Sequence, residues 1–142
     1  MTKVLFFHGA GDRLQAAVAW LSDSYRQHKP VLVYAPDPVI AERLDRLLWT
    51  HPSTGFLPHA RTDDPLARET PVLIASHLET LPQEECLLNL SNEVPPGFSR
   101  FSELVEIVSD GGDDRLPARD RFKFYRERGY DLASQKFDSK PA

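Results

Sequence analysis

The fold is decided by the stretch Pro30-Val-Leu-Val-Tyr-Ala35 and by the segment that follows it. These six residues form a continuous apolar run, which is typical of a strand buried on both faces of a parallel sheet. Asp37 can cap a helix that begins at Pro38 and runs to about Trp49, because aspartate favours the cap position and proline favours the first turn. The predicted inward face of this helix consists of four aliphatic residues: Ile40, Leu44, Leu47 and Leu48.

The segment before this stretch has the same organisation. Lys3–Phe7 predicts a short apolar strand, His8–Asp12 a turn, and Asp12 the cap of a helix that runs to about His28. The predicted inward face of that helix is made by Leu14, Ala17, Val18 and Leu21. A strand–helix–strand–helix order indicates βαβ units and therefore a mostly parallel sheet.

The second half of the chain continues the sheet. Three more strands are predicted, at Thr70–Ala75, Glu85–Leu90 and Leu104–Val108. Thr50–Pro65 is expected to be a loop, although it holds more hydrophobic residues than loops usually do. The polar segment Ala133–Ala142 is expected to be a frayed tail, so the predicted domain covers residues 1–132.

Composition and charge limit the function classes. The chain has 142 residues, which suits one domain, and its 41% hydrophobic and 27% charged residues are ordinary for a globular protein. The net charge is −4 and the pI is near 5.7. Indiscriminate binding to nucleic acid usually needs a broad basic surface, so strong direct binding to nucleic acid is not expected.

Several features favour a cytoplasmic location. No apolar run approaches the length needed to cross a bilayer, and the N-terminus enters Lys3–Phe7 without the apolar segment and cleavage site of a signal peptide. Cys86 is the only cysteine, so an intrachain disulfide is impossible, and its apolar neighbours predict a small buried hydrophobe. We therefore expect a cytoplasmic protein without membrane contact.

The last predicted helix is strongly basic. It spans the region from Arg115 to Arg128, with Pro117 in its first turn and Gly129 at the left-handed position after its end. This region carries six basic and two acidic side chains, a local net charge of +4, so the rest of the chain carries −8. Such an asymmetric charge distribution points to a binding partner rather than to a fold.

The spacing of the basic residues sharpens this prediction. Arg119, Lys123 and Arg126 stand at i, i+4 and i+7 and fall on one stripe of the helix, bordered by Phe122, while Tyr125 faces away and can pack inward. A cationic row beside an exposed aromatic ring suits an acidic peptide or a carboxylate. The alternative is a solvated basic face that serves only solubility, and spacing alone favours this second interpretation.

Gly9-Ala-Gly11, after the first predicted strand, is similar to a dinucleotide-binding loop. The match is incomplete, because Leu14 stands where the third glycine belongs and no lysine follows to make a P-loop. A tight strand-to-helix turn is the simpler interpretation. A small α/β nucleotide-binding protein or enzyme that uses the Gly9–Asp12 turn is the alternative that stays open.

The sequence shows no pattern of catalytic or metal-ligating residues. The five histidines share no metal-ligand spacing on a helix, and the serines lie outside any Gly-x-Ser-x-Gly turn. The acidic pairs Glu84-Glu85 and Asp113-Asp114 fall in predicted turns, where solvation explains them better than acid–base chemistry. We therefore expect no catalytic activity, no cofactor and no metal.

Three blocks of sequence carry a resemblance to a known family. The first comprises Leu48-Trp49, Pro52, Phe56, Pro58 and His59. The second comprises Asn89-Leu90, Pro95 and Phe98. The third and most specific is Arg119-x-Arg121-Phe122-Lys123-x-Tyr125-Arg126-x-x-Gly129-Tyr130-x-Leu132. In this order and spacing, and over nearly the whole chain, the blocks resemble the chi subunits of bacterial DNA polymerase III.

The resemblance implies a fold and two partners. The implied fold is a single Rossmann-like, three-layer α/β domain without catalytic activity. One implied partner is the acidic C-terminal tail of single-stranded DNA-binding protein, which ends in a phenylalanine carboxylate. The other is the psi subunit, which connects chi to the clamp loader; chi would be a monomer alone and a heterodimer with psi.

The resemblance also implies site residues. The tail site of the family falls on Arg119, Phe122, Lys123 and Arg126 of this chain, and the psi surface falls on Trp49, Pro52 and Phe56. Without the resemblance, Trp49 and Phe56 would be predicted to be core residues, because large aromatic side chains are mostly buried. The leading hypothesis is a non-catalytic replication adaptor that links single-stranded DNA-binding protein to the clamp loader.

Overall fold

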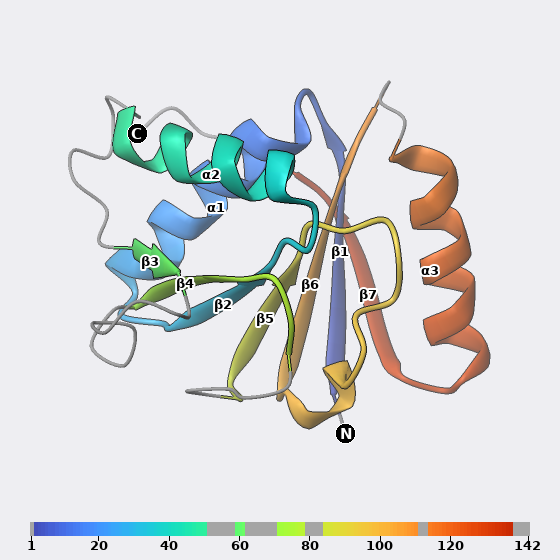
Figure 1. Cartoon of the computed structure of the whole chain (residues 1–142). Helices are drawn as coiled ribbons and strands as arrows, with labels where there is room; N and C mark the ends of the chain where they lie inside the picture. Colours follow the sequence, from blue (N-terminus) through green and yellow to red (C-terminus); the bar gives the residue numbers. More distant parts are fainter. Residues whose placement is uncertain (1, 51–58, 62–70, 79–83, 111–113, 138–142) are drawn as a thin grey trace.

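The computed structural model describes residues 2–50, 59–61, 71–78, 84–110 and 114–137. Within these residues, seven parallel strands form one sheet in the order β3-β4-β2-β5-β6-β1-β7 (Figure 1). The strands are β1 (Lys3–Ala10), β2 (Val31–Tyr34), β3 (His59–Arg61), β4 (Val72–Ala75), β5 (Cys86–Asn89), β6 (Glu103–Ser109) and β7 (Asp131–Lys136).

Helices cover both faces of this sheet. α1 (Arg13–Arg26) and α2 (Pro38–Thr50) lie on one face, and α3 (Arg115–Glu127) lies on the other (Figure 1). A short 3₁₀ helix, η2 (Phe98–Arg100), precedes β6. Both predicted helix caps are present. Asp12 Oδ1 accepts a hydrogen bond from the Gln15 N–H, and Asp37 Oδ1 accepts one from the Val39 N–H, each at 2.9 Å. The expected single Rossmann-like, three-layer α/β domain is confirmed.

The two faces of the sheet carry separate hydrophobic cores. Alternation along β2 divides its side chains, so that Val31 and Val33 face α1 and α2 while Leu32 and Tyr34 face the α3 side. Both faces are buried, as the continuous apolar run predicted. The helix residues that are fully buried against the first core are Ala17, Val18, Leu21, Leu44 and Leu48, and those partly buried there are Leu14, Ile40 and Leu47.

The structure differs from the prediction at the end of β1 and in the loop that follows α2. β1 continues to Ala10, although the turn was expected to begin at His8. Gly9 adopts φ +77°, which allows the strand to continue past an irregularity in its register with β6. The loop expected over Thr50–Pro65 contains β3, a three-residue edge strand paired with β4. A strand this short is below the length at which alternation can be recognised.

The expectation of a frayed tail from Ala133 is wrong for residues 133–136. These residues belong to β7, which pairs with β1 from Asp131 to Lys136, and the ring of Phe137 packs edge-on against Phe7 at 6.0 Å. The boundary expected at Leu132 therefore falls inside a strand. The polar composition misled the prediction because β7 is an edge strand whose side chains are mostly exposed.

Candidate functional site

The predicted cationic row lies on the outer face of α3. Arg119, Lys123 and Arg126 are all exposed, as their spacing predicted. The Lys123 Nζ atom lies 4.0 Å from Glu127 Oε1, in a pair whose two side chains are about two-thirds exposed (66% and 64%). Such an exposed pair contributes little to stability and leaves the lysine available to a partner.

Phe122 borders the row but is not the exposed ring that was expected. It is half-buried, and its ring meets that of Phe6 on β1 in a T-shaped contact at 5.2 Å. Tyr125 is fully buried behind it, as predicted. Phe122 therefore presents part of one ring to the solvent and anchors the helix with the rest.

Leu116 was not singled out from the sequence. It is 70% exposed, which makes it the most exposed large hydrophobic residue of the part of the chain that the structure describes. It stands three residues before Arg119 and seven before Lys123, so it lies on the same stripe of α3. The outer face of α3 is therefore a cationic row with an apolar residue at its N-terminal end.

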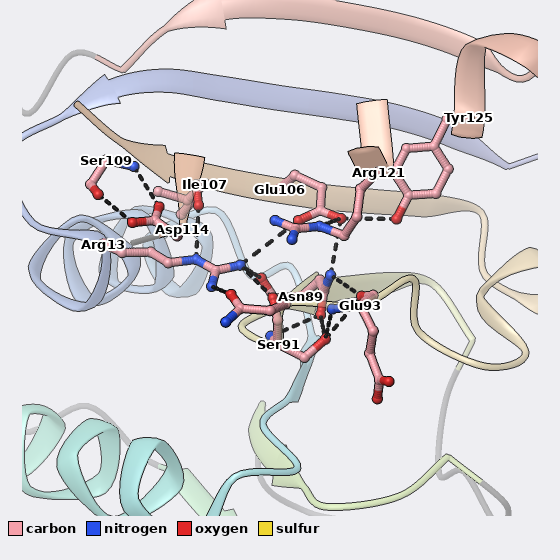
Figure 2. Close-up of polar contacts among 11 residues, drawn as sticks. Arg13, Asn89, Ser91, Glu93, Glu106, Ile107, Ser109, Asp114, Arg121 and Tyr125 are labelled. Carbon is pink, nitrogen blue, oxygen red and sulfur yellow. Dashed lines mark hydrogen bonds and ion pairs between the residues drawn. The ribbon is translucent and has the colours of Figure 1, made fainter. Parts of the chain in front are cut away.

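One of the helix cations is buried and takes no part in this row. The Arg121 side chain is 2% exposed, and its Nε donates to Glu106 Oε2 on β6 at 3.0 Å (Figure 2). The same carboxylate oxygen accepts from Tyr125 Oη at 2.8 Å and from Asn89 Nδ2 at 3.0 Å. Burial, and then the negative charge of Glu106, raise the pKa of the Tyr125 hydroxyl, so that it stays a donor.

A second, largely buried arginine completes this network at the C-terminal edge of the sheet. Arg13, the first residue of α1, donates to the carbonyl oxygens of Ile107 and Ser91 at 2.9 Å each and of Asn89 at 3.1 Å (Figure 2). Its Nη2 lies 3.9 Å from Glu106 Oε1. Burial lowers the pKa of Arg13, and the charge of Glu106 opposes that shift. Arg13 thus ties the ends of two strands to the start of α1.

The start of α3 is tied to β6 in a similar way. Asp114, the residue before α3, accepts from the backbone N–H of Ser109 at 2.8 Å and also from its hydroxyl (Figure 2). Burial acts to raise the pKa of Asp114, but the hydrogen bonds from Ser109, a further backbone hydrogen bond and the positive charge of Arg13 together outweigh it, so the pKa is lowered. With Arg121 held by Glu106, α3 is fixed at its beginning and in its middle.

The charge balance of α3 changes accordingly. Arg121 is paired inside the protein, so the exposed side chains from Arg115 to Arg128 comprise five cations and two anions, a net charge of +3. A buried arginine in the motif could not be recognised from charge alone. The signal was Glu106, a carboxylate at an inward position of an apolar strand, which needs a buried cation.

The Gly9–Asp12 turn does not form an open anion site. The Asp12 carboxylate occupies the N-terminus of α1 by accepting from the Gln15 N–H, and Arg13 donates to three backbone carbonyls. A Cβ atom on Gly9 would come within 3.4 Å of the Lys136 side chain, so this glycine allows close packing against β7. A phosphate at this helix end would face the negative charge of Asp12, which favours the interpretation as a structural turn.

Trp49 lies at the C-terminal end of α2 and is 57% exposed. Core packing, the interpretation that residue type alone favoured, is therefore wrong for Trp49. Its ring makes a T-shaped contact with His59 at 5.1 Å. Pro52 and Phe56, the other two residues of the expected psi surface, lie outside the described residues.

The part of the chain that the structure describes holds neither a metal-binding cluster nor a membrane-spanning helix. In the described ranges, no group of three histidine, cysteine or acidic residues is close enough to hold a metal ion. None of the helices described there has the length and hydrophobicity to cross a membrane. The Cys86 thiol is fully buried, and burial raises its pKa to about 12, so it remains a neutral core residue.

Comparison with known proteins decides the family. The family model described as "DNA polymerase III chi subunit, HolC" matches residues 1–133. The chain belongs to this family. The match to chi subunits covers the whole described α3 and runs into β7.

Three chi subunits show the extent of the similarity. The Pseudomonas aeruginosa DNA polymerase III subunit chi is 32% identical over 136 residues, which cover 93% of this chain and 94% of the relative. The chi subunit of Escherichia coli is 30% identical over 112 residues, covering 78% and 76% of the two chains. That of Haemophilus influenzae is 26% identical over 112 residues, covering 78% of each. The resemblance drawn from the three sequence blocks is confirmed, and the chain is assigned to a family of replication accessory subunits.

Proposed function

We propose that this chi-family chain is a non-catalytic adaptor that connects the acidic C-terminal tail of single-stranded DNA-binding protein to the clamp loader through psi. The observation that carries the proposal is the exposed row of Arg119, Lys123 and Arg126, bordered by Phe122. The rest of the chain is acidic, so this row is the part of the molecule that favours an anionic partner.

The row suits a short acidic peptide that ends in a carboxylate. Neighbours at i and i+4 on a helix have Cβ atoms about 5–6 Å apart, so Arg119 and Lys123 can reach one carboxylate together. Arg119 can bind that carboxylate through two parallel hydrogen bonds. The half-buried ring of Phe122 and the exposed Leu116 supply apolar contacts for a terminal phenylalanine on either side of the charges.

The second partner, psi, is assigned to the surface around Trp49, with Pro52 and Phe56. Support comes from the exposure of Trp49, because an indole with more than half of its surface in water is a common anchor of protein interfaces. Trp49 on α2 and the row on α3 lie on opposite faces of the sheet (Figure 1), so one chain could hold both partners at once. We expect a monomer that forms a heterodimer with psi.

Binding through a protein tail also fits the charge of the molecule. The net charge of −4 opposes close approach to DNA, whereas a peptide can use the row on α3 alone. The competing proposal of a nucleotide site at Gly9–Asp12 is disfavoured by the carboxylate of Asp12 at the start of α1.

The test uses purified proteins. Full-length single-stranded DNA-binding protein and a form without its last ten or so residues are passed over the immobilised chain, with and without psi. The proposal predicts retention of the full-length form only, and simultaneous retention of psi. Equal retention of both forms would show that the C-terminal tail is not the segment that binds. Saturable heat on titration with a mononucleotide would favour the competing proposal of a nucleotide site.

A further inference from the structure

His59 is a buried imidazole beneath an exposed indole. Its side chain is 1% exposed, whereas Trp49, whose ring it contacts, is 57% exposed. A histidine this deeply buried needs a hydrogen-bond partner, and Asp45 provides one, with His59 Nε2 and Asp45 Oδ1 separated by 2.9 Å. The aspartate side chain is 40% exposed, so the pair joins the surface of α2 to the edge of the sheet.

Asp45, Trp49 and His59 form one cluster in which His59 contacts the other two. Asp45 and Trp49 stand at i and i+4 on α2, so their side chains are neighbours on one side of the helix. His59 comes from β3, the edge strand, and contacts both of them. Its ring centroid lies 5.1 Å from that of Trp49, with 66° between the ring planes, an edge-to-face geometry that aromatic rings prefer. The imidazole is therefore held by the carboxylate in an orientation that supports the indole.

We propose that His59 and Asp45 are positioning residues for Trp49. They hold the indole in the orientation that it presents to a protein partner, so that less side-chain freedom is lost when the partner binds. This inference rests on the proposed function, in which the Trp49 surface binds psi. Pre-ordering one large side chain is expected to strengthen association roughly two- to tenfold.

The positioning is tested at Asp45 rather than at His59. Removing a buried imidazole could disturb β3, whereas Asp45 is a partly exposed residue of a regular helix. Asp45→Ala removes the acceptor of the imidazole, while Asp45→Asn keeps an amide oxygen that can accept the same hydrogen bond. Glu42→Ala is the matched control, because it removes another carboxylate of α2, one that pairs with Arg46.

Two measurements are made on each variant. Time-resolved fluorescence anisotropy reports the local motion of the Trp49 indole, in a Trp20→Phe background that removes the other tryptophan. The dissociation constant for psi is measured separately. We expect Asp45→Ala to increase the amplitude of fast indole motion and to weaken psi binding two- to tenfold, while Asp45→Asn and Glu42→Ala match the parent.

The outcomes separate the two proposals. An indole that stays as immobile in Asp45→Ala as in the parent would overturn the positioning role, whatever psi does. A mobile indole with unchanged psi affinity would support the positioning of Trp49 by Asp45 and His59 but refute its contribution to psi binding. If the parent fails to bind psi, the proposed function fails for this surface, and the anisotropy measurement still decides whether Asp45 and His59 fix Trp49.

Discussion

The buried pair of Arg121 and Glu106 gives the sharpest test of how α3 is held. The perturbations are Arg121→Met, Glu106→Gln and the double variant, which together form a double-mutant cycle. Methionine keeps most of the length of the arginine stem, and glutamine keeps an oxygen that can still accept from Tyr125 and Asn89. Each single change leaves one member of a fully buried ion pair without its partner.

The expected magnitudes follow from what each change leaves behind. Removing one member of a buried pair costs about 3–5 kcal/mol. Arg121→Met belongs at the lower end, about 3 kcal/mol, because Glu106 keeps two hydrogen bonds and the Arg13 guanidinium at 3.9 Å. Glu106→Gln belongs higher, about 4 kcal/mol, because the buried guanidinium of Arg121 and the largely buried one of Arg13 both lose their anion.

The double variant distinguishes a coupled pair from two independent losses. Neither of its side chains carries a charge, so we expect a loss of about 2–4 kcal/mol, well below the sum of the single losses. Part of the loss is offset because methionine also removes both Nη atoms of Arg121, which make no hydrogen bond in the described structure. The assay is equilibrium unfolding in urea at pH 7, with circular dichroism as the signal. Additive losses would refute the coupling, and a large loss of tail binding in Arg121→Met without a change in fold would refute the assignment of Arg121 to the interior.

Three further predictions concern pH, salt and the second surface. The pKa of Asp114 is lowered in the folded protein, so the stability that its carboxylate contributes is present above the ordinary carboxyl pKa and is lost as the pH falls through the lower folded pKa. Asp114→Asn should therefore flatten the fall in the free energy of unfolding at acidic pH, and an unchanged fall would contradict this prediction. Affinity for the tail peptide should fall as salt rises, because exposed charges are screened over about 8–10 Å at 0.1–0.15 M salt, and a flat titration would count against the row on α3. Trp49→Ala should weaken psi association about tenfold or more while tail binding and circular dichroism stay unchanged, and a variant that unfolds would show that Trp49 is structural instead.

The fold was predictable where hydrophobic periodicity is strong. The four-residue apolar runs, the aspartate caps and the inward faces of α1 and α2 gave the layers and the parallel sheet correctly. β3 and β7 were missed because both are edge strands, and an edge strand buries too little to impose an alternating pattern. Their pairing depends on β4 and β1, which are distant in the sequence.

The candidate site was predictable in its charges but not in its burial. Spacing placed Arg119, Lys123 and Arg126 on one exposed stripe, because helical geometry fixes which residues share a face. It did not show that Phe122 packs against Phe6, because such a contact depends on how the helix is docked on the sheet. That docking is determined by the buried network around Glu106, which joins residues from four elements: α1, β5, β6 and α3.

The central claim is that the row on α3 binds the acidic tail, and Lys123→Glu tests it most directly. Lys123 is four residues from Arg119 and three from Arg126, so reversing its charge places an anion in the middle of the row. Fluorescence anisotropy with a labelled tail peptide, at one moderate salt concentration, compares the parent, Lys123→Glu and Arg43→Glu, an exposed reversal on α2 with the same change in net charge. We predict a loss of about 1–3 kcal/mol, roughly ten- to a hundredfold in affinity, for Lys123→Glu alone, with thermal stability nearly unchanged. Equal affinities of the parent and Lys123→Glu, or equal losses in both variants, would contradict the assignment of the tail site to this helix.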